Sequence, residues 1–163
     1  MIMKVNTEER WLPIVETKAR AGKTVVLKVA DVMTENPLTV EPSDTLEQVE
    51  ELLEEHRIRQ LPVVEGTVLV GIITDRDIRP FLRDRYLGSP EEQERVMKTT
   101  VAAVMSPKPI TLSPNDDLKE AIELLIEEKM GGIPVVDQDG EAVVGIVTYV
   151  DVLRCFLELL QEE

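Results

Sequence analysis

Threonine and aspartate recur three residues apart in two similar stretches of the chain, GIITDRD and GIVTYVD. The pairs are Thr74 with Asp77 and Thr148 with Asp151. An ionised carboxylate can accept hydrogen bonds from two adjacent hydroxyls of a ligand, and free N–H groups at a helix start suit an anion. A structural alternative is that both residues only cap a helix. Because the aspartate would then be a redundant second acceptor in both copies, we favour the ligand-binding interpretation.

These stretches belong to an internal repeat that organises most of the chain. Residues 29–65 align without a gap on residues 101–137, and further matches follow a short insertion near DQDGE. Self-similarity of this kind defines structural units before any single element is assigned. The sequence predicts a helical N-terminal segment, a first repeat, a linker helix, a second repeat and a tail, over residues 1–28, 29–87, 88–100, 101–160 and 161–163.

Each repeat has the pattern of a strand, a helix, a two-stranded hairpin and a second helix. Asp44 and Asp116 are the expected N-caps of the first helices. The closing helices are expected over residues 78–87 and 152–160, the first being regular only from the residue before Pro80, because proline fits only near a first turn. The predicted fold class is α/β (α+β), with the two repeats packed as a pseudo-twofold pair.

Composition excludes several classes of function. The formal net charge of -14 argues against nucleic-acid and anionic-membrane binding, which need a basic surface. No apolar run reaches the roughly 20 residues that cross a bilayer. The single Cys155 forms no internal disulfide, and no signal peptide is evident, so we expect a cytoplasmic protein.

The order of these motifs resembles a pair of CBS domains, named from cystathionine β-synthase, which together form a Bateman module. The resemblance covers about residues 29–160 and rests on VMTENPLTV with VMSPKPITL, on LPVV with IPVV, and on the two Gly-to-Asp stretches. It implies clefts between the repeats for adenosine-containing regulatory ligands, namely AMP, ADP, ATP or S-adenosylmethionine. With TDRDIR closing the first copy, the chain is also similar to small bacterial proteins linked to acetoin utilisation, which implies a regulator of an unidentified partner protein.

The resemblance also implies a role for individual residues. The two aspartates, Asp77 and Asp151, would hold ribose hydroxyls, and Thr74 and Thr148 would lie near phosphate. The adenine ring would lie among apolar side chains, with backbone groups of two threonines at its edge; these residues are Val40, Ile58, Pro62, Leu112, Ile133, Pro134, Thr39 and Thr111.

Basic residues distinguish the two copies. HRIRQLPVVE resembles a stretch of the gamma subunit of AMP-activated protein kinase in which the matching His and Arg touch nucleotide phosphates. Those residues are His56 and Arg57 here, with Arg59 and Arg76 close by, whereas the second copy keeps a cation only at Lys129. The first repeat is therefore expected to supply most of the charge for a phosphorylated ligand, with Ser106 and Lys108 as weaker candidates.

Neither catalysis nor metal binding is expected. His56 is the only histidine and Cys155 the only cysteine, and they lie in different repeats. No Cys/His set has the spacing of a zinc site.

An apolar stripe on the second repeat suggests a partner. Ile122 and Ile126 occupy the positions of Glu50 and Glu54, which we expect to face solvent. Such a stripe is usually covered. Either the N-terminal segment around Trp11 or a second copy covers it, and the family resemblance favours a homodimer. The alternative function, a dimerisation or docking module without a ligand, would need the same stripe.

Overall fold

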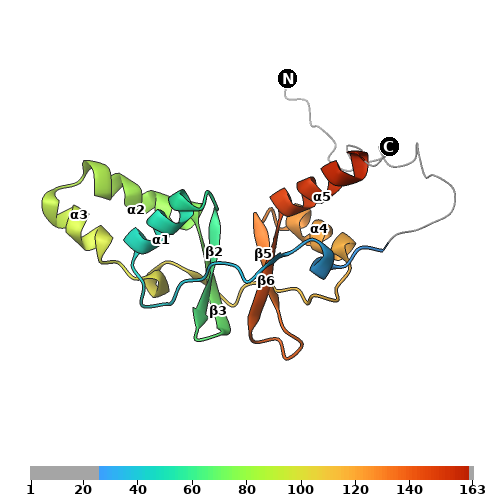
Figure 1. The fold of residues 1–163 in the computed structure, drawn as a ribbon. Coiled ribbons are helices and arrows are strands. Elements are labelled where there is room, and N and C mark those ends of the chain that lie inside the picture. Colours follow the sequence, from blue (N-terminus) through green and yellow to red (C-terminus); the bar gives the residue numbers. More distant parts are fainter. Residues whose placement is uncertain (1–25, 162–163) are drawn as a thin grey trace, which may run out of the picture.

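The computed structural model describes residues 26–161, which form two lobes whose hairpins face each other at the centre of the molecule (Figure 1). The first lobe contains α1 (Leu46–Glu55), β2 (Gln60–Glu65), β3 (Val68–Thr74), α2 (Asp75–Leu87), α3 (Pro90–Met97), η2 (Val101–Ala103) and β4 (Ser106–Pro107). The second lobe contains η1 (Val29–Asp31), β1 (Thr34–Glu35), α4 (Leu118–Glu127), β5 (Gly132–Val136), β6 (Val143–Thr148) and α5 (Tyr149–Gln161). The predicted mixture of helices and hairpins is confirmed. No helix within residues 26–161 is both long and apolar enough to cross a bilayer.

Each lobe has a three-stranded antiparallel sheet that takes its short edge strand from the start of the other repeat. The strand orders are β2-β3-β4 and β1-β6-β5, with Ile72 opposite Ser106 and Thr34 opposite Ile146. A Cβ atom on Gly71 would lie 2.6 Å from the sulfur of Met105. Glycine is therefore required where the edge strand approaches, and the two repeats are interlocked.

The strands expected at PLTVEP and PITLSP are reduced to single parallel bridges. Val40 pairs with Val63, and Leu112 pairs with Val135. The N–H of Val40 donates to the carbonyl of Pro62 at 3.1 Å. Because prolines flank both stretches, few N–H groups remain to extend these pairings.

The first helix of each repeat begins one residue later than predicted. Thr45, not Asp44, is the N-cap of α1, and its hydroxyl and the side chain of Gln48 form a capping box. Asp44 instead accepts the N–H of Glu41 at 2.7 Å and so closes the preceding turn. Asp116 likewise accepts the N–H of Ser113 at 2.7 Å, while Asp117 is the N-cap of α4.

The prediction that Pro80 lies near the start of α2 was wrong. The helix begins at Asp75 and contains Pro80 in its interior. Both Pro80 and Arg76, whose carbonyl loses its helical partner, lie on the exposed side, where water can take the missing hydrogen bond. The linker helix α3 has its predicted start, with Ser89 as N-cap and Pro90 as the first helical residue.

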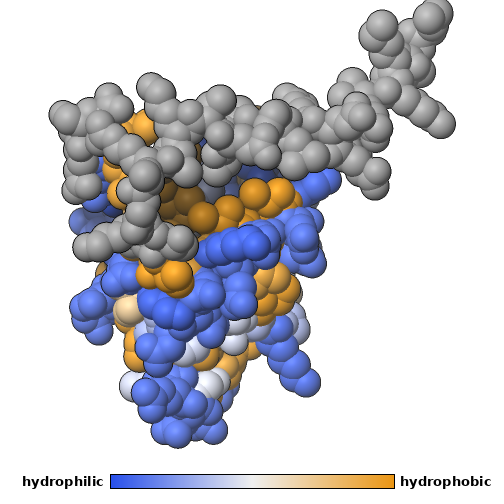
Figure 2. All heavy atoms as spheres, turned by 90° about the vertical axis from the view of Figure 1, so that its right-hand side faces the viewer, coloured by the Kyte–Doolittle hydropathy of each residue, from blue (hydrophilic) through white to orange (hydrophobic). Residues whose placement is uncertain are grey.

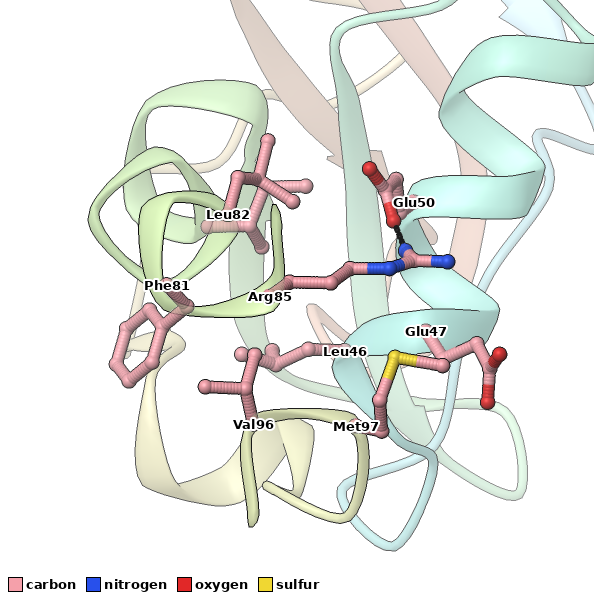
Figure 3. Close-up of a pocket in the computed structure, with 9 residues that line it drawn as sticks. Leu46, Glu47, Glu50, Phe81, Leu82, Arg85, Val96 and Met97 are labelled. Carbon is pink, nitrogen blue, oxygen red and sulfur yellow. Dashed lines mark ion pairs between the residues drawn. The ribbon is translucent and has the colours of Figure 1, made fainter. Parts of the chain in front are cut away.

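Two apolar cores lie between the sheets and the helices. Leu53, Leu61 and Ile73 belong to the first core, and Leu125 and Ile133 to the second. The expectation that Glu50 faces solvent was wrong, because this side chain is 5% exposed. Its carboxylate pairs with the guanidinium of Arg85, which reaches across from α2 (Figure 3). It also accepts the hydroxyl of Tyr86 at 3.1 Å.

Candidate ligand-binding cleft

A cleft of about 530 Å³ lies where the two lobes meet, a size typical of small-molecule sites. It draws on the segment around β1, on the turn after α1, and on the junction of β6 with α5. Its lining residues are Thr34, Asn36, Pro37, Leu38, His56, Arg57, Ile58, Arg59, Gln60, Pro62, Gly131, Ile146, Thr148, Tyr149, Val150, Asp151 and Arg154. The cleft therefore combines residues of both repeats.

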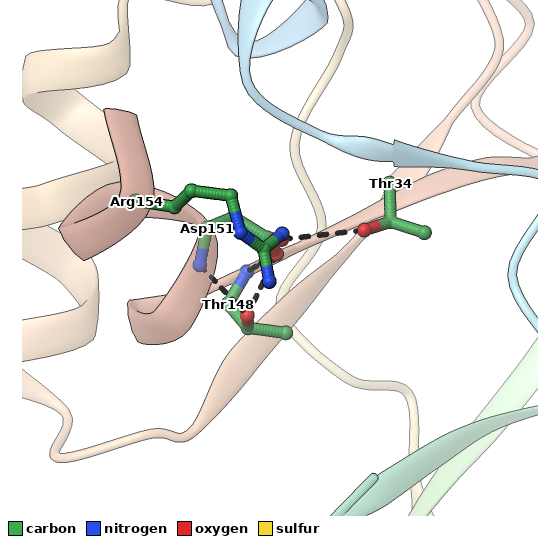
Figure 4. Close-up of polar contacts among 4 residues, drawn as sticks. All are labelled: Thr34, Thr148, Asp151 and Arg154. Atoms are coloured by element: carbon green, nitrogen blue, oxygen red, sulfur yellow. Dashed lines mark hydrogen bonds and ion pairs between the residues drawn. The ribbon is translucent and has the colours of Figure 1, made fainter. Parts of the chain in front are cut away.

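Asp151 is a buried charged residue of the cleft, with 8% of its surface exposed. Its Oδ2 accepts the N–H of Thr148 at 2.8 Å and the hydroxyl of Thr148 at 2.6 Å. Its Oδ1 accepts the hydroxyl of Thr34 at 3.3 Å and lies 3.7 Å from a guanidinium nitrogen of Arg154 (Figure 4). The contacts of Oδ1 are longer, so this oxygen has the greater capacity to accept a ligand hydroxyl.

The capping role considered for Thr and Asp is present in both repeats. Thr74 accepts the N–H of Asp77 through its hydroxyl, and Asp77 accepts the N–H of Thr74 at 2.8 Å. Thr148 and Asp151 repeat this exchange. Our argument that the aspartate is redundant was wrong, because the two side chains serve different N–H groups in a capping box. Capping uses one carboxylate oxygen and leaves the other available to accept a ligand hydroxyl.

Three arginines and one histidine line the cleft. His56, Arg57 and Arg59 come from the turn after α1, and Arg154 comes from α5. The first three were selected from the sequence, and the structure brings them to the aspartate of the opposite repeat. Planar guanidinium groups are well suited to phosphate.

Backbone conformation around the cleft is unusual at related positions. Arg57 and Asn36 have φ values of 53° and 46°, and their equivalents in the other repeat, Lys129 and Lys108, have 53° and 51°. Positive φ is uncommon for such residues and costs energy that the surrounding structure must supply. The turns that bear these side chains are thus held in one conformation.

Several predicted adenine contacts lie elsewhere. Val40, Leu112 and Ile133 are 3%, 4% and 0% exposed and belong to the two cores. Ile58 and Pro62 do line the cleft, whereas Pro134 is fully buried outside its lining. Thr39 and Thr111 are exposed and are not among its lining residues.

A second group of predicted residues lies at the end of β3. Pairing of β4 with β3 places Ser106 opposite Ile72, two residues before Thr74. Asp77 follows in the first turn of α2. These positions, with Arg76 and Lys108, correspond through the repeat to residues around the cleft described above, but none of them lines it.

Sequence reasoning missed four polar residues of the cleft: Thr34, Asn36, Gln60 and Arg154. A signal existed for Thr34 and Asn36, because their counterparts Ser106 and Lys108 had been selected in the second copy. Arg154 was missed because the first repeat has Pro80 at the matching position.

Comparison with known proteins gives consistent results. The family model of the CBS domain matches residues 29–84 and 101–158. The crystal structure of CBSX2 of Arabidopsis thaliana in complex with AMP has a TM-score of 0.70 and 30% identity, and the match covers 82% of this chain and 98% of the chain in that structure.

Two other structures have similar scores. The CBS domain pair of MJ0100, in complex with 5′-methylthioadenosine and S-adenosyl-L-methionine, has a TM-score of 0.69 and 28% identity over 82% of this chain and 98% of that one. A Vibrio cholerae protein assigned to acetoin utilization, AcuB, has a TM-score of 0.71 and 30% identity over 84% and 95%. The chain therefore belongs to the CBS domain family and contains a tandem pair of these domains.

Proposed function

We propose that the protein is a non-catalytic regulatory module that binds an adenosine-containing ligand in this cleft. The supporting observation is the position of Asp151, whose Oδ1 lies among Thr34, Arg154 and the basic turn of the opposite repeat. AMP, present in the CBSX2 structure, and S-adenosyl-L-methionine, present in the MJ0100 structure, belong to the same chemical class.

The charges of the cleft favour a phosphorylated ligand. Arg57, Arg59 and Arg154 line it together with His56, whereas the carboxylate of Asp151 is partly occupied by the cap. A nucleotide such as AMP, ADP or ATP carries negative charge, but S-adenosylmethionine carries a sulfonium cation. Adenine nucleotides are therefore proposed to bind more tightly than S-adenosylmethionine.

The pseudo-twofold relation supports a second site around Asp77. Thr74, Arg76, Ser106 and Lys108 would contribute to it, because they correspond to or lie beside positions that line the first cleft. This second site has fewer basic residues, so the two sites differ in their preference for phosphate.

Ligand occupancy is proposed to reach a partner protein through the relative position of the lobes. A ligand that contacts both lobes binds one arrangement better and shifts the population toward it. A coupling free energy of about 1–3 kcal/mol would change partner affinity by roughly 5–150-fold.

A homodimer is proposed through the second lobe. Ile126, Leu153 and Leu157 are 56%, 60% and 54% exposed, and Ile122 lies one turn before Ile126. Figure 2, which faces this side of the molecule, shows hydrophobic side chains gathered there. A second copy would bury this surface.

Thermal unfolding with AMP, ADP, ATP and S-adenosylmethionine tests the ligand proposal. A ligand at 100 times its dissociation constant adds about 2.7 kcal/mol, which raises the Tm of a protein of this size by roughly 5–10 °C. The nucleotides are expected to give the larger shifts. No shift with any of the four would favour the alternative, a dimerisation module without a ligand.

A further inference from the structure

The linker helix α3 covers a groove between the two helices of the first lobe (Figure 1). Val96 of α3 is 5% exposed and lies with Met97 against Leu46 of α1 and Phe81 and Leu82 of α2 (Figure 3). The apolar side chains of this groove are therefore removed from water by a segment that precedes η2.

The second lobe has the matching helix pair, α4 and α5, but among residues 26–161 no element takes the place of α3. The repeat makes Leu118, Ile122, Cys155, Phe156 and Leu159 the counterparts of Leu46, Glu50, Phe81, Leu82 and Arg85. Phe156 and Leu159 are 57% and 54% exposed. Isoleucine and leucine thus replace the charged pair of the first lobe. The surface between the two helices is therefore more apolar in the second lobe than in the first.

The chain enters both lobes by the same contacts. Leu46 donates its N–H to the carbonyl of Thr99 at 2.9 Å, and Leu118 donates to the carbonyl of Leu27 at 2.9 Å. The bridge of Thr45 with Thr100 likewise corresponds to that of Asp117 with Lys28. Leu27 therefore holds in the second lobe the position that Thr99, just after α3, holds in the first.

The segment that leads to this point has suitable length and composition. Residues 1–25 exceed the eight residues of α3 and include an apolar group at Trp11, Leu12, Ile14 and Val15. Residues 1–28 contain six Lys and Arg but only three Glu, whereas α4 carries one lysine and three glutamates. The segment and the rim of the groove have opposite net charge.

We propose that the N-terminal segment around Trp11–Val15 packs on its own chain, in the groove between the start of α4 and the second half of α5. This position leaves Ile126 and Leu153 free for the proposed dimer, because they lie at the end of α4 and in the first half of α5, toward the other end of the helix pair. The inference depends on neither the ligand nor the dimer.

Tryptophan fluorescence tests this placement directly, because Trp11 is the only tryptophan of the chain. The full-length protein is expected to show blue-shifted emission and weak quenching by acrylamide. Leu159→Glu, in the groove, should shift the emission to the red and increase quenching. Leu87→Glu, at an 80% exposed position at the end of α2, is the matched control and should leave both unchanged.

A variant in the segment itself controls for the possibility that Leu159→Glu exposes Trp11 by misfolding the lobe. Leu12→Glu changes a residue outside residues 26–161 and should expose Trp11 to the same degree as Leu159→Glu while circular dichroism stays unchanged. A solvent-exposed Trp11 in the unaltered protein, or burial that neither substitution affects, would overturn the proposal. Burial that disappears on dilution to the monomer would also overturn it and would identify a second copy as the occupant.

Discussion

At the scale of single residues, one carboxylate serves structure and can still serve recognition. Asp151 caps α5 through Oδ2, and Oδ1 lies at the cleft with only longer contacts. The repeated Thr-x-x-Asp spacing is therefore fully explained by capping. The case for ligand binding depends instead on what surrounds the second oxygen.

Asp151→Asn separates the two roles. The amide oxygen can still accept the N–H of Thr148, so the Tm without ligand should change little. The loss of a charge-assisted hydrogen bond, about 1.5–3 kcal/mol, should weaken AMP binding by roughly 10–150-fold in calorimetric titration. Asp77→Asn, which alters the same cap outside the cleft, is the control and should leave the affinity of the described cleft unchanged. Equal affinity in Asp151→Asn and the unaltered protein would contradict the ribose role.

Arg57→Asn tests the phosphate role without disturbing the turn, because asparagine tolerates positive φ. Binding of AMP should fall by at least the tenfold that about 1.4 kcal/mol represents, while binding of adenosine is unchanged. Lys129→Asn has the same φ of 53° in the other repeat and lies outside the cleft lining, so it should have no such effect. An equal loss for adenosine would refute the assignment.

At the scale of elements, the helix pairs of the two lobes are packed with different residues. The helix pair of the first lobe has a buried glutamate paired with arginine, and α3 lies across it. The matching positions in the second lobe are isoleucine and leucine. A buried ion pair is weak evidence for stability, because desolvation offsets much of the attraction.

Glu50→Ala should destabilise the protein strongly, by up to about 3–5 kcal/mol, because Arg85 loses its partner in a largely buried position. The double variant Glu50→Ile with Arg85→Leu, which copies the second lobe, should be close to neutral. Urea denaturation measures both. Glu54→Ala, at an exposed position on the same helix, should stay within about 0.5 kcal/mol. A double variant as unstable as Glu50→Ala would contradict this account.

Acid should loosen α3. The backbone N–H of Ser89 holds the pKa of Glu92 below its usual 4.5. Because the folded-state value is the lower one, the stabilisation is complete above about 4.5 and is lost as the pH falls through the folded-state value. The protection factors of the α3 amides, which correct for the slower intrinsic exchange in acid, should therefore fall as the pH is lowered. Glu92→Gln keeps an acceptor that does not titrate and should lack this fall; the same pH dependence of protection in both proteins would exclude the mechanism.

At the scale of the whole molecule, the sequence predicted the parts better than their connections. The hairpins and the start of α3 follow from patterns within a few residues, and the repeat follows from comparing the two halves of the sequence. The edge strands β1 and β4 are two residues long, so they have no periodicity, and their partners lie in the other repeat. The N-cap of α1 was misplaced because Asp44 and Thr45 both suit that position.

The candidate site was predicted in the same uneven way. His56, Arg57, Arg59, Thr148 and Asp151 were selected and do meet in one cleft. The basic turn of one repeat faces the aspartate of the other because of long-range packing. Local sequence patterns do not predict such packing. Val40, Leu112 and Ile133, which were predicted as adenine contacts, belong to the hydrophobic cores, because apolar residues beside a cleft also form the hydrophobic interior.

The interlocked edge strands make the lobes a single unit at whose junction a ligand can act. A crystal structure of the protein with AMP is the most direct test. The account predicts the ribose hydroxyls within hydrogen-bonding distance of Oδ1 of Asp151 and the phosphate facing Arg57 and Arg154. AMP bound elsewhere, or a cleft that stays empty at saturating AMP, would contradict it.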